Sequence, residues 1–297
     1  MAHRSVYRGL LFASPWIVGF LVFQLVPIIA SAYYSFTNFN LFQDPQFVGL
    51  HNYQRLTSDD LFWKSLFNTV YLTVFGVPIS LTAALIAALA LNMRVRGQWF
   101  FRTVVFLPTV VPVVAATYIW RWLLNGQYGF VNEALAAAHL GQPLWLDDPP
   151  WTKPALILMS LWVTGSAMIV FLAALQDVPG IYYEAATIDG AGLWAKFRHI
   201  TIPLISPVIL FETIIAGIFT LQYFTQAYLL SQTRFNAASG GPENSLLVYG
   251  LYLFQQGFVN LNMGYASAMA WVLLFVALAG TLLLLRLSRN RVFYAGE

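Results

Sequence analysis

The segment Leu204–Leu230, LISPVILFETIIAGIFTLQYFTQAYLL, decides the fold class of this 297-residue chain. It carries one charged side chain, Glu212, and it exceeds the about 20 residues with which a helix crosses a bilayer core of about 30 Å. The whole chain is also strongly apolar: 59% of its residues are apolar, 9% are charged and its mean hydropathy is +0.67. So few charges cannot cover a soluble domain, in which about a quarter of the residues are charged. The sequence therefore predicts an integral membrane protein in contact with the lipid bilayer.

Five further segments have the same length and apolar character. They are Gly9–Tyr34, Leu66–Leu91, Thr103–Leu124, Ala155–Ala174 and Gly264–Leu285. Arginines precede the first of them, as in a secretory signal peptide, but its apolar run of about twenty residues exceeds the roughly 7–15 of such peptides. We therefore predict that this segment is retained, and that residues 1–297 form one all-α, polytopic transmembrane domain with six helices.

Prolines interrupt several of these segments. Each removes a backbone donor and favours a kink, which a helix bundle tolerates where neighbours or water satisfy the freed carbonyl. Such kinks can serve only to fit the helices into a bundle, or they can be hinges that move during function. These prolines are Pro15, Pro27, Pro78, Pro108, Pro112 and Pro207.

The positions of the charges predict the orientation, because basic residues near helix ends are retained in the cytoplasm. If six helices alternate, the arginines at the helix ends share one side: Arg4, Arg8, Arg94, Arg96, Arg102, Arg286, Arg289 and Arg291. Acidic residues predominate on the other side: Asp44, Asp59, Asp60, Glu133, Asp147, Asp148 and Glu243. We therefore expect both termini in the cytoplasm. The net charge of +3 is too small to indicate a nucleic-acid partner.

The cytoplasmic loop between the fourth and fifth segments, Asp177–Pro203, reads DVPGIYYEAATIDGAGLWAKFRHITIP. We expect a helix over Ile181–Ile188, a reversal at Gly190 and Gly192, and a second short helix that ends near Pro203. Apolar residues recur at helical spacing in both halves, so each helix has an apolar face that must be buried. An elbow lying in the membrane interface and a docking element for a partner both satisfy this pattern.

The spacing within this loop is more informative than its amphipathic character. Glu184-Ala185-Ala186, followed by Gly190, Ile200 and Pro203, resembles the EAA signature of the permease subunits of bacterial ATP-binding cassette (ABC) importers. Ile202 stands where that pattern usually has leucine. Other stretches along essentially the whole chain resemble the MalF/UgpA-like sugar permeases of this family: Phe47–Tyr53, Phe101-Arg102 with Phe106–Pro108, Trp120-Arg121, Gly129 with Val131-Asn132, and Gly240–Pro242 with Asn244-Ser245.

The resemblance implies the permease fold of type I ABC importers, in the cell inner membrane. It implies that the loop is a coupling helix-turn-helix docked on an ATPase subunit, where Glu184 caps or bridges polar groups of the partner and Gly190 supplies the turn. The matching positions are Glu184, Ala185, Ala186, Asp189, Gly190, Gly192, Ile200 and Pro203. The implied partners are a second, MalG-like permease, two MalK-like ATPase subunits that bind ATP and Mg²⁺, and an extracytoplasmic solute-binding protein.

The residues themselves also indicate a transport subunit without its own ATPase site. The chain has no G-x-x-x-x-G-K-[ST] phosphate loop, no cysteine and only four scattered histidines, so we expect no enzyme activity, no cofactor and no metal site in this chain. No extracytoplasmic segment is much longer than about thirty residues, which is too short for a ligand-binding domain. A separate binding protein should therefore dock on the loops Asn38–Lys64, Asn125–Lys153 and Ser231–Met263.

The fifth segment also suggests where a solute passes. Glu212, Phe219, Gln222, Tyr223 and Gln226 fall within an arc of about 100° on one helix face. Amides and aromatic rings suit a sugar, polyol or glycoside, but glutamines can equally tie helices together. For Glu212 we favour a structural bond to a neighbouring helix or to the second permease over a role in the pathway.

A secondary transporter or channel for a small polar solute is the alternative function. That class favours internal repeats and several ionisable groups inside the membrane, whereas only Glu212 lies clearly inside. Arg121, near the outer end of the third segment, should snorkel or pair with an acid in a loop. The sequence does not identify the solute.

Overall fold

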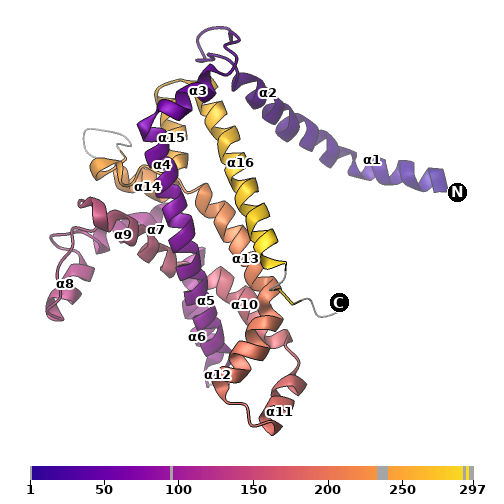
Figure 1. Ribbon diagram of the computed structural model, residues 1–297, viewed down its shortest axis with the longest axis vertical. Coiled ribbons are helices and arrows are strands. Elements are labelled where there is room, and N and C mark those ends of the chain that lie inside the picture. The colour runs from indigo at the N-terminus through magenta and orange to yellow at the C-terminus, as the bar shows by residue number, and fades with distance from the viewer. Residues whose placement is uncertain (1, 94–95, 233–239, 290–291, 294–297) are drawn as a thin grey trace. The chain divides into compact units, whose positions relative to one another are not determined.

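The computed structural model describes residues 2–93, 96–232, 240–289 and 292–293, and the side chains from residue 11 onward. Arg94 and Arg291 of the predicted charge pattern lie outside these residues, as do the side chains of Arg4 and Arg8. Within the described residues the chain is helical and has no β-strand beyond an isolated bridge between Thr37 and Phe47 (Figure 1). The expected all-α class is confirmed.

In the described part of the chain, four helices are long and apolar enough to cross a membrane without a sharp bend. They are Leu11–Tyr34, Asp60–Asn92, Leu193–Ser231 and Met263–Ser288. Two bent pairs satisfy the same criterion: Gln98–Val110 with Val113–Leu123, bent by 99°, and Pro149–Trp162 with Gly165–Asp177, bent by 52°. Counting each pair as one span gives up to six, so the predicted number depends on each bent pair crossing the bilayer once.

The first span consists of α1 (Ala2–Phe20), a π-helical turn η1 (Leu21–Leu25) and α2 (Val26–Tyr34), and the second of α4 (Asp60–Tyr71), η2 (Leu72–Gly76) and α5 (Val77–Asn92). The bent pairs are α6 (Gln98–Phe106) and η3 (Leu107–Val110) with α7 (Val113–Leu123), and α9 (Pro149–Trp162) with α10 (Gly165–Asp177). Next come α11 (Gly180–Ile188), α12 (Leu193–Lys196), η4 (Phe197–Thr201), α13 (Ile202–Leu221) and α14 (Thr225–Ser231). The last span is α16 (Met263–Ser288), and the connections hold α3 (His51–Ser58), α8 (Phe130–Ala137), η5 (Pro242–Asn244), α15 (Tyr249–Phe254) and η6 (Gln255–Val259).

Three of the π-helical turns end two residues before a proline: η1 before Pro27, η2 before Pro78 and η4 before Pro203. A proline ring clashes with the carbonyl four residues earlier and offers no N–H to it, and a wider turn relieves both problems. The predicted end of the second loop helix near Pro203 is therefore wrong, because α12 continues through η4 into α13 as one helix.

A proline also explains the bend in the third span. Val111 and Pro112 are extended, with ψ of 128° and 133°, because the ring of Pro112 disfavours helical geometry at the preceding residue. The helix α7 then restarts at Val113, turned by 99° from the preceding helix.

The larger of two compact units, Leu61–Tyr252 with Val276–Glu297, has its core where α5, α10 and α13 pack together (Figure 1). Ala84 and Ala88 are fully buried one turn apart, and such small side chains let a neighbouring helix approach closely. The helix α10 brings larger buried side chains to this face: Met168, Phe171, Leu172 and Leu175. A Cβ atom at Gly165 would lie 2.7 Å from the carbonyl oxygen of Val105, so the start of α10 requires glycine against α6.

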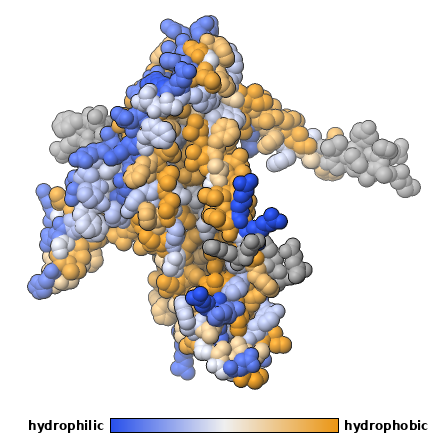
Figure 2. All heavy atoms as spheres, viewed as in Figure 1, coloured by the Kyte–Doolittle hydropathy of each residue, from blue (hydrophilic) through white to orange (hydrophobic). Residues whose placement is uncertain are grey.

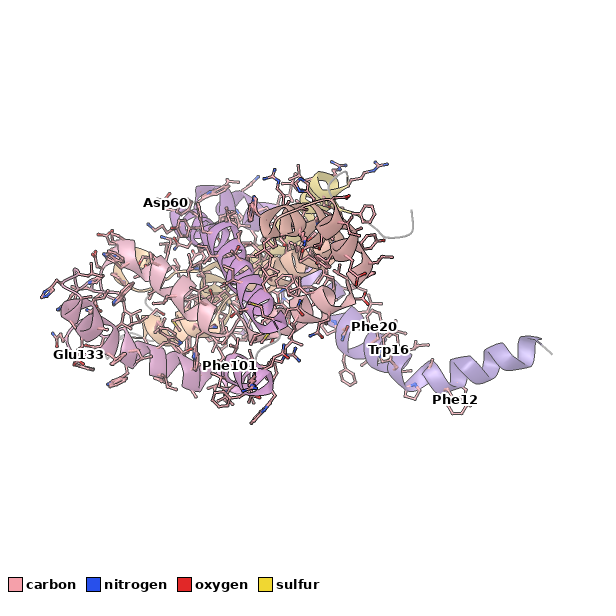
Figure 3. All side chains as sticks on the ribbon, turned by 90° about the horizontal axis from the view of Figure 1, so that it is seen from below. Phe12, Trp16, Phe20, Asp60, Phe101 and Glu133 are labelled. Atoms are coloured by element: carbon pink, nitrogen blue, oxygen red, sulfur yellow. The ribbon has the colours of Figure 1, made fainter. Side chains whose placement is uncertain are left out.

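The smaller unit comprises Met1–Asp60 and Leu253–Phe275. Here the N–H of Gly264 donates to the carbonyl of Phe39 at 3.0 Å, and a Cβ atom at Gly264 would overlap the carbonyl oxygen of Thr37. The first helix presents apolar side chains outward, including Phe12, Trp16 and Phe20 (Figure 3). Hydrophobic residues likewise dominate the outer surface of the long helices in Figure 2, as expected for surfaces that face lipid or other membrane helices.

Candidate functional site

Three cavities of the larger unit share Tyr223. The first, of about 460 Å³, lies between α5, α9, α10 and α13 and also includes Glu212 and Phe219. The second, of about 300 Å³, includes Phe219, Gln222 and Gln226. The third, of about 320 Å³, lies at the bend before α7 and also includes Gln226. All five residues of the predicted stripe therefore line connected positions around Tyr223.

The stripe does not lie on one continuous helix, contrary to the predicted arc. The helix α13 ends at Leu221 and α14 begins at Thr225, so Gln222, Tyr223 and Phe224 form a break. A Cβ atom at Gly250 would lie 3.0 Å from the carbonyl oxygen of Tyr223, which shows how closely α15 approaches the break. Backbone unwound at membrane depth is tolerated where it is covered by protein or lines a cavity, and both conditions hold here.

The first cavity combines one carboxylate with several hydroxyls. Glu212, Ala216 and Phe219 lie on one face of α13, at spacings of four and three residues, and Tyr223 follows just beyond the end of that helix. Across from them, the hydroxyl oxygens of Ser80 on α5 and Ser160 on α9 lie 2.8 Å apart. Sequence reasoning missed the hydroxyl-bearing residues of this lining; their only signal was isolated serines and threonines on otherwise apolar helices: Ser80, Ser160, Thr164, Ser166 and Thr220.

The polar side chains of the stripe are not used to tie this chain's own helices together. Glu212, Gln222 and Gln226 make no side-chain hydrogen bond or ion pair with any residue that the structure describes. Polar groups inside a membrane protein usually find partners, so these three remain available to water, a solute or another subunit. This observation favours the pathway interpretation over helix pairing within the chain.

The loop between the fourth and fifth spans begins with α11, where the sequence predicts a helix. The helix α11 ends in a Schellman motif. The N–H of Gly190 donates to the carbonyl of Thr187 at 3.1 Å, and the N–H of Ala191 donates to the carbonyl of Ala186 at 2.8 Å. Gly190 has a φ of +77°, which explains glycine there, because other L-residues are strained in this conformation. Gly192 has a φ of −71°, so the reversal itself depends on Gly190.

Side chains brace the two helical parts of this loop against each other. The hydroxyls of Tyr183 on α11 and Thr201 in η4 share a hydrogen bond at 2.9 Å. The ammonium group of Lys196 donates to the hydroxyl of Thr187 at 2.7 Å. Because η4 continues directly into α13, these bonds connect α11 to the base of the helix that carries Glu212.

The outer surface of the loop is apolar and exposed. The exposed fraction is 88% for Ile188 and 89% for Leu193, and it is 69% for both Ile181 and Trp194. The predicted burial of the apolar faces is therefore not achieved within this chain at Ile181, Ile188 and Leu193, whereas Phe197 and Ile200 are half-buried. Clustered apolar side chains at a loop indicate a surface that another component covers.

The remaining predicted coupling residues lie on or just after α11, or at the start of α13. Glu184 and Ala185 are exposed on α11, and Ala186 is half-buried beside them. Asp189 follows the last helical residue of α11. Pro203 occupies the second position of α13, in continuous helix.

Three buried asparagines anchor the connections between helices. The Asn52 amide donates to the carbonyls of Ser35 and Thr37, at 2.9 and 2.8 Å. The Asn68 amide donates to the carbonyls of Asn244 and Leu247 at 2.9 and 2.8 Å. Asn132 likewise donates to Gly126 and Pro143 and accepts from Trp145. Sequence analysis singled out Asn52 and Asn132 only as motif positions, because their partners are visible only in three dimensions.

Arg121 does not pair with a loop acid among the described residues, contrary to one of the two roles expected for it. Its guanidinium group donates to the carbonyls of Leu229 and Gln232, at 3.4 and 3.3 Å, and thereby braces the end of α14. The described residues also contain no cluster of three or more histidine, aspartate or glutamate side chains placed to hold a metal ion.

Comparison with known proteins gives a consistent result. The family model described as "Binding-protein-dependent transport system inner membrane component" matches residues 76–292. Of the curated relatives, YesP of Bacillus subtilis, named as a probable ABC transporter permease, is 39% identical over 97% of this chain and 93% of its own length. The lactose transport system permease protein LacF of Rhizobium radiobacter is 38% identical over 96% of this chain and 95% of its own.

A solved structure shares the fold. One chain of the crystal structure of a bacterial alginate ABC transporter, in complex with an alginate pentasaccharide-bound periplasmic protein, superposes with a TM-score of 0.81 at 24% identity. The match covers 98% of this chain and 99% of that one. The family model and the relatives support a transport-system component over a secondary transporter or channel.

Proposed function

This chain belongs to the family of inner membrane components of binding-protein-dependent transport systems, and from that premise we propose that it is an ABC importer permease for a sugar, polyol or glycoside. The observation that carries the proposal is the set of unpaired polar side chains around Tyr223, which offers hydrogen-bonding groups beside aromatic rings. The lactose permease relative supports a carbohydrate as the solute class.

We propose that the loop of α11 and α12 couples the chain to ATP hydrolysis on another subunit. The exposed apolar side chains of Ile188 and Leu193 form the surface to be covered, and Glu184 lies exposed on α11 as a polar contact. The hydrogen bond between Tyr183 and Thr201 makes α11 move with α13. A displacement of the ATPase subunit would then reach the helix that lines the cavity.

The proposed assembly contains a second permease, two ATPase subunits that bind ATP and Mg²⁺, and an extracytoplasmic solute-binding protein. In this proposal the chain itself hydrolyses no ATP and holds no cofactor. The binding protein docks on the loops 38–64, 125–153 and 231–263, of which residues 233–239 lie outside the described residues. The buried amide hydrogen bonds of Asn52, Asn132 and Asn68 order the backbone within each loop, which supports the use of these loops as docking elements.

The chain is an integral, multi-pass membrane protein, as its family and its apolar helices show. We propose that it lies in the inner membrane with both termini in the cytoplasm. The described arginines near helix ends support this orientation, since two lie between the end of α5 and the middle of α6 and two lie at the end of α16: Arg96, Arg102, Arg286 and Arg289.

Reconstitution into vesicles tests the proposal. We expect uptake only when this chain is combined with the second permease, the ATPase subunits, the binding protein and ATP. Omission of each component in turn should abolish uptake, while a carbohydrate bound by the binding protein should stimulate ATP hydrolysis. Uptake by this chain alone in ATP-free vesicles would contradict the proposal.

A further inference from the structure

The cavity of about 460 Å³ beside α13 is lined by one acidic residue and by no basic residue of the described chain. We infer that it admits uncharged, hydroxyl-bearing solutes and rejects anionic ones, with Glu212 acting as a charge filter. This inference rests on the proposed function, because it concerns the pathway of the same solute. It goes further by excluding a chemical class, that of uronates and phosphorylated sugars.

The lining supports this class of solute. Among its described residues, Glu212 alone is charged, and no lysine, arginine or histidine faces the cavity. Six residues bring hydroxyl groups, which can exchange hydrogen bonds with a polyhydroxylated solute: Ser80, Ser160, Thr164, Ser166, Thr220 and Tyr223. The volume falls within the about 300–1,000 Å³ of typical small-molecule sites.

The carboxylate of Glu212 is not neutralised by its own chain. It makes no ion pair or hydrogen bond with a described residue, and the residues one turn away on α13, Val208 and Ala216, are apolar. A charge with apolar protein around it acts over a longer range than one in bulk water, because the surroundings screen it weakly. An anion that enters this cavity meets a like charge and finds no cation to offset it.

The absence of cysteine from the native chain provides a direct test. Ala216 lies one turn from Glu212 and lines the same cavity, so Ala216→Cys places a thiol next to the carboxylate. In the assembled complex, the thiol reacts with a cationic and an anionic methanethiosulfonate reagent of similar size, and mass spectrometry of this chain gives the two rates. The ratio of the cationic to the anionic rate is then compared with the ratio in the double variant that also carries Glu212→Gln. Gln176→Cys, at an exposed position near the end of α10, is the matched control outside the cavity.

We expect the cationic reagent to react faster than the anionic one at Ala216→Cys. Adding Glu212→Gln should lower the ratio of the cationic to the anionic rate by about tenfold or more, because two charges a few ångströms apart interact strongly. The ratio at Gln176→Cys should not change. An unchanged ratio at Ala216→Cys overturns the inference. So does a lack of reaction with both reagents while Gln176→Cys reacts, because the cavity is then closed to aqueous solutes. The measurement needs no transport, so a failure of the proposed function appears separately, as loss of ATP-driven uptake with the charge preference intact.

Discussion

The hydroxyl of Tyr183 hydrogen-bonds to the hydroxyl of Thr201 across 2.9 Å, and this bond joins the loop helix α11 to the base of the helix that lines the cavity. Thr201 is 6% exposed, so the bond is shielded from water on one side. It is a direct side-chain link between the proposed ATPase-docking surface and the proposed pathway. Its removal should separate the two activities.

We predict that Tyr183→Phe lowers solute uptake per ATP hydrolysed. A single hydrogen bond contributes about 0.5–1.5 kcal/mol, so the loop should loosen without unfolding. Tyr182→Phe is the matched control, because the hydroxyl of the neighbouring, half-exposed Tyr182 bonds to no described residue. The check is the ratio of uptake to ATPase rate in proteoliposomes. An equal ratio in both variants would show that this bond does not transmit the motion.

The turn at Gly190 gives a second prediction. Gly190→Ala should destabilise the loop by about 1–2 kcal/mol, because alanine is strained at a φ of +77° although no atom lies within 4 Å of its Cβ position. Gly192→Ala, at a φ of −71° and with equally open space, should leave the loop intact. Hydrogen exchange of the amides over 180–201 distinguishes the two variants. Equal protection in both would mean that the left-handed turn is not needed.

Glu184→Lys reverses the charge of an exposed residue on α11. We expect it to leave membrane insertion and solute binding by the binding protein unchanged, while it weakens docking of the ATPase subunit and lowers stimulated ATP hydrolysis. Co-purification of the ATPase subunit and its ATPase rate measure both effects. Normal docking and normal coupling would remove Glu184 from the proposed interface.

The break between α13 and α14 gives a fourth prediction. Gln222→Ala or Tyr223→Ala should change the concentration dependence or the rate of uptake by several-fold, since a lost hydrogen bond to a solute is worth about 0.5–1.5 kcal/mol. The assembled complex should be recovered in normal yield. Gln176→Ala, an exposed glutamine at the end of α10, is the control. Wild-type uptake kinetics in both break variants would assign these residues to packing.

Asn68 offers a prediction about stability. It is fully buried and its amide donates to two carbonyls of the segment 244–247, so Asn68→Ala should lower the free energy of unfolding by about 1–3 kcal/mol. Asn260→Ala, at an exposed site, should have little effect. Thermal unfolding in detergent compares the two variants. Equal stability would show that the segment is held by its own backbone hydrogen bonds.

Much of the architecture follows from local sequence. Long apolar segments predict the helices because a lipid-exposed backbone must satisfy its own hydrogen bonds. Their positions overlap helices of the structure, but the fifth helix begins at Leu193 instead of Leu204, and helices break near Pro112, at Val163–Thr164 and at Gln222–Phe224. The helix over residues 181–188 and the turn at Gly190 are likewise local, since capping and φ depend on a few neighbouring residues.

Hydropathy does not show how the helices join or which side chains meet. The π-helical turn before Pro203 makes α12, η4 and α13 one continuous helix, whereas proline alone suggested a boundary. The hydroxyls of Ser80 and Ser160 come together from helices far apart in sequence, and Asn68 reaches a segment 176 residues away. Sequence by itself determined the all-α membrane class and the family, because apolar length and motif spacing are local properties. Only the tertiary structure decided which polar groups face a shared cavity, because packing between distant helices pairs some of them and leaves Glu212, Gln222 and Gln226 unpaired by the rest of the described chain.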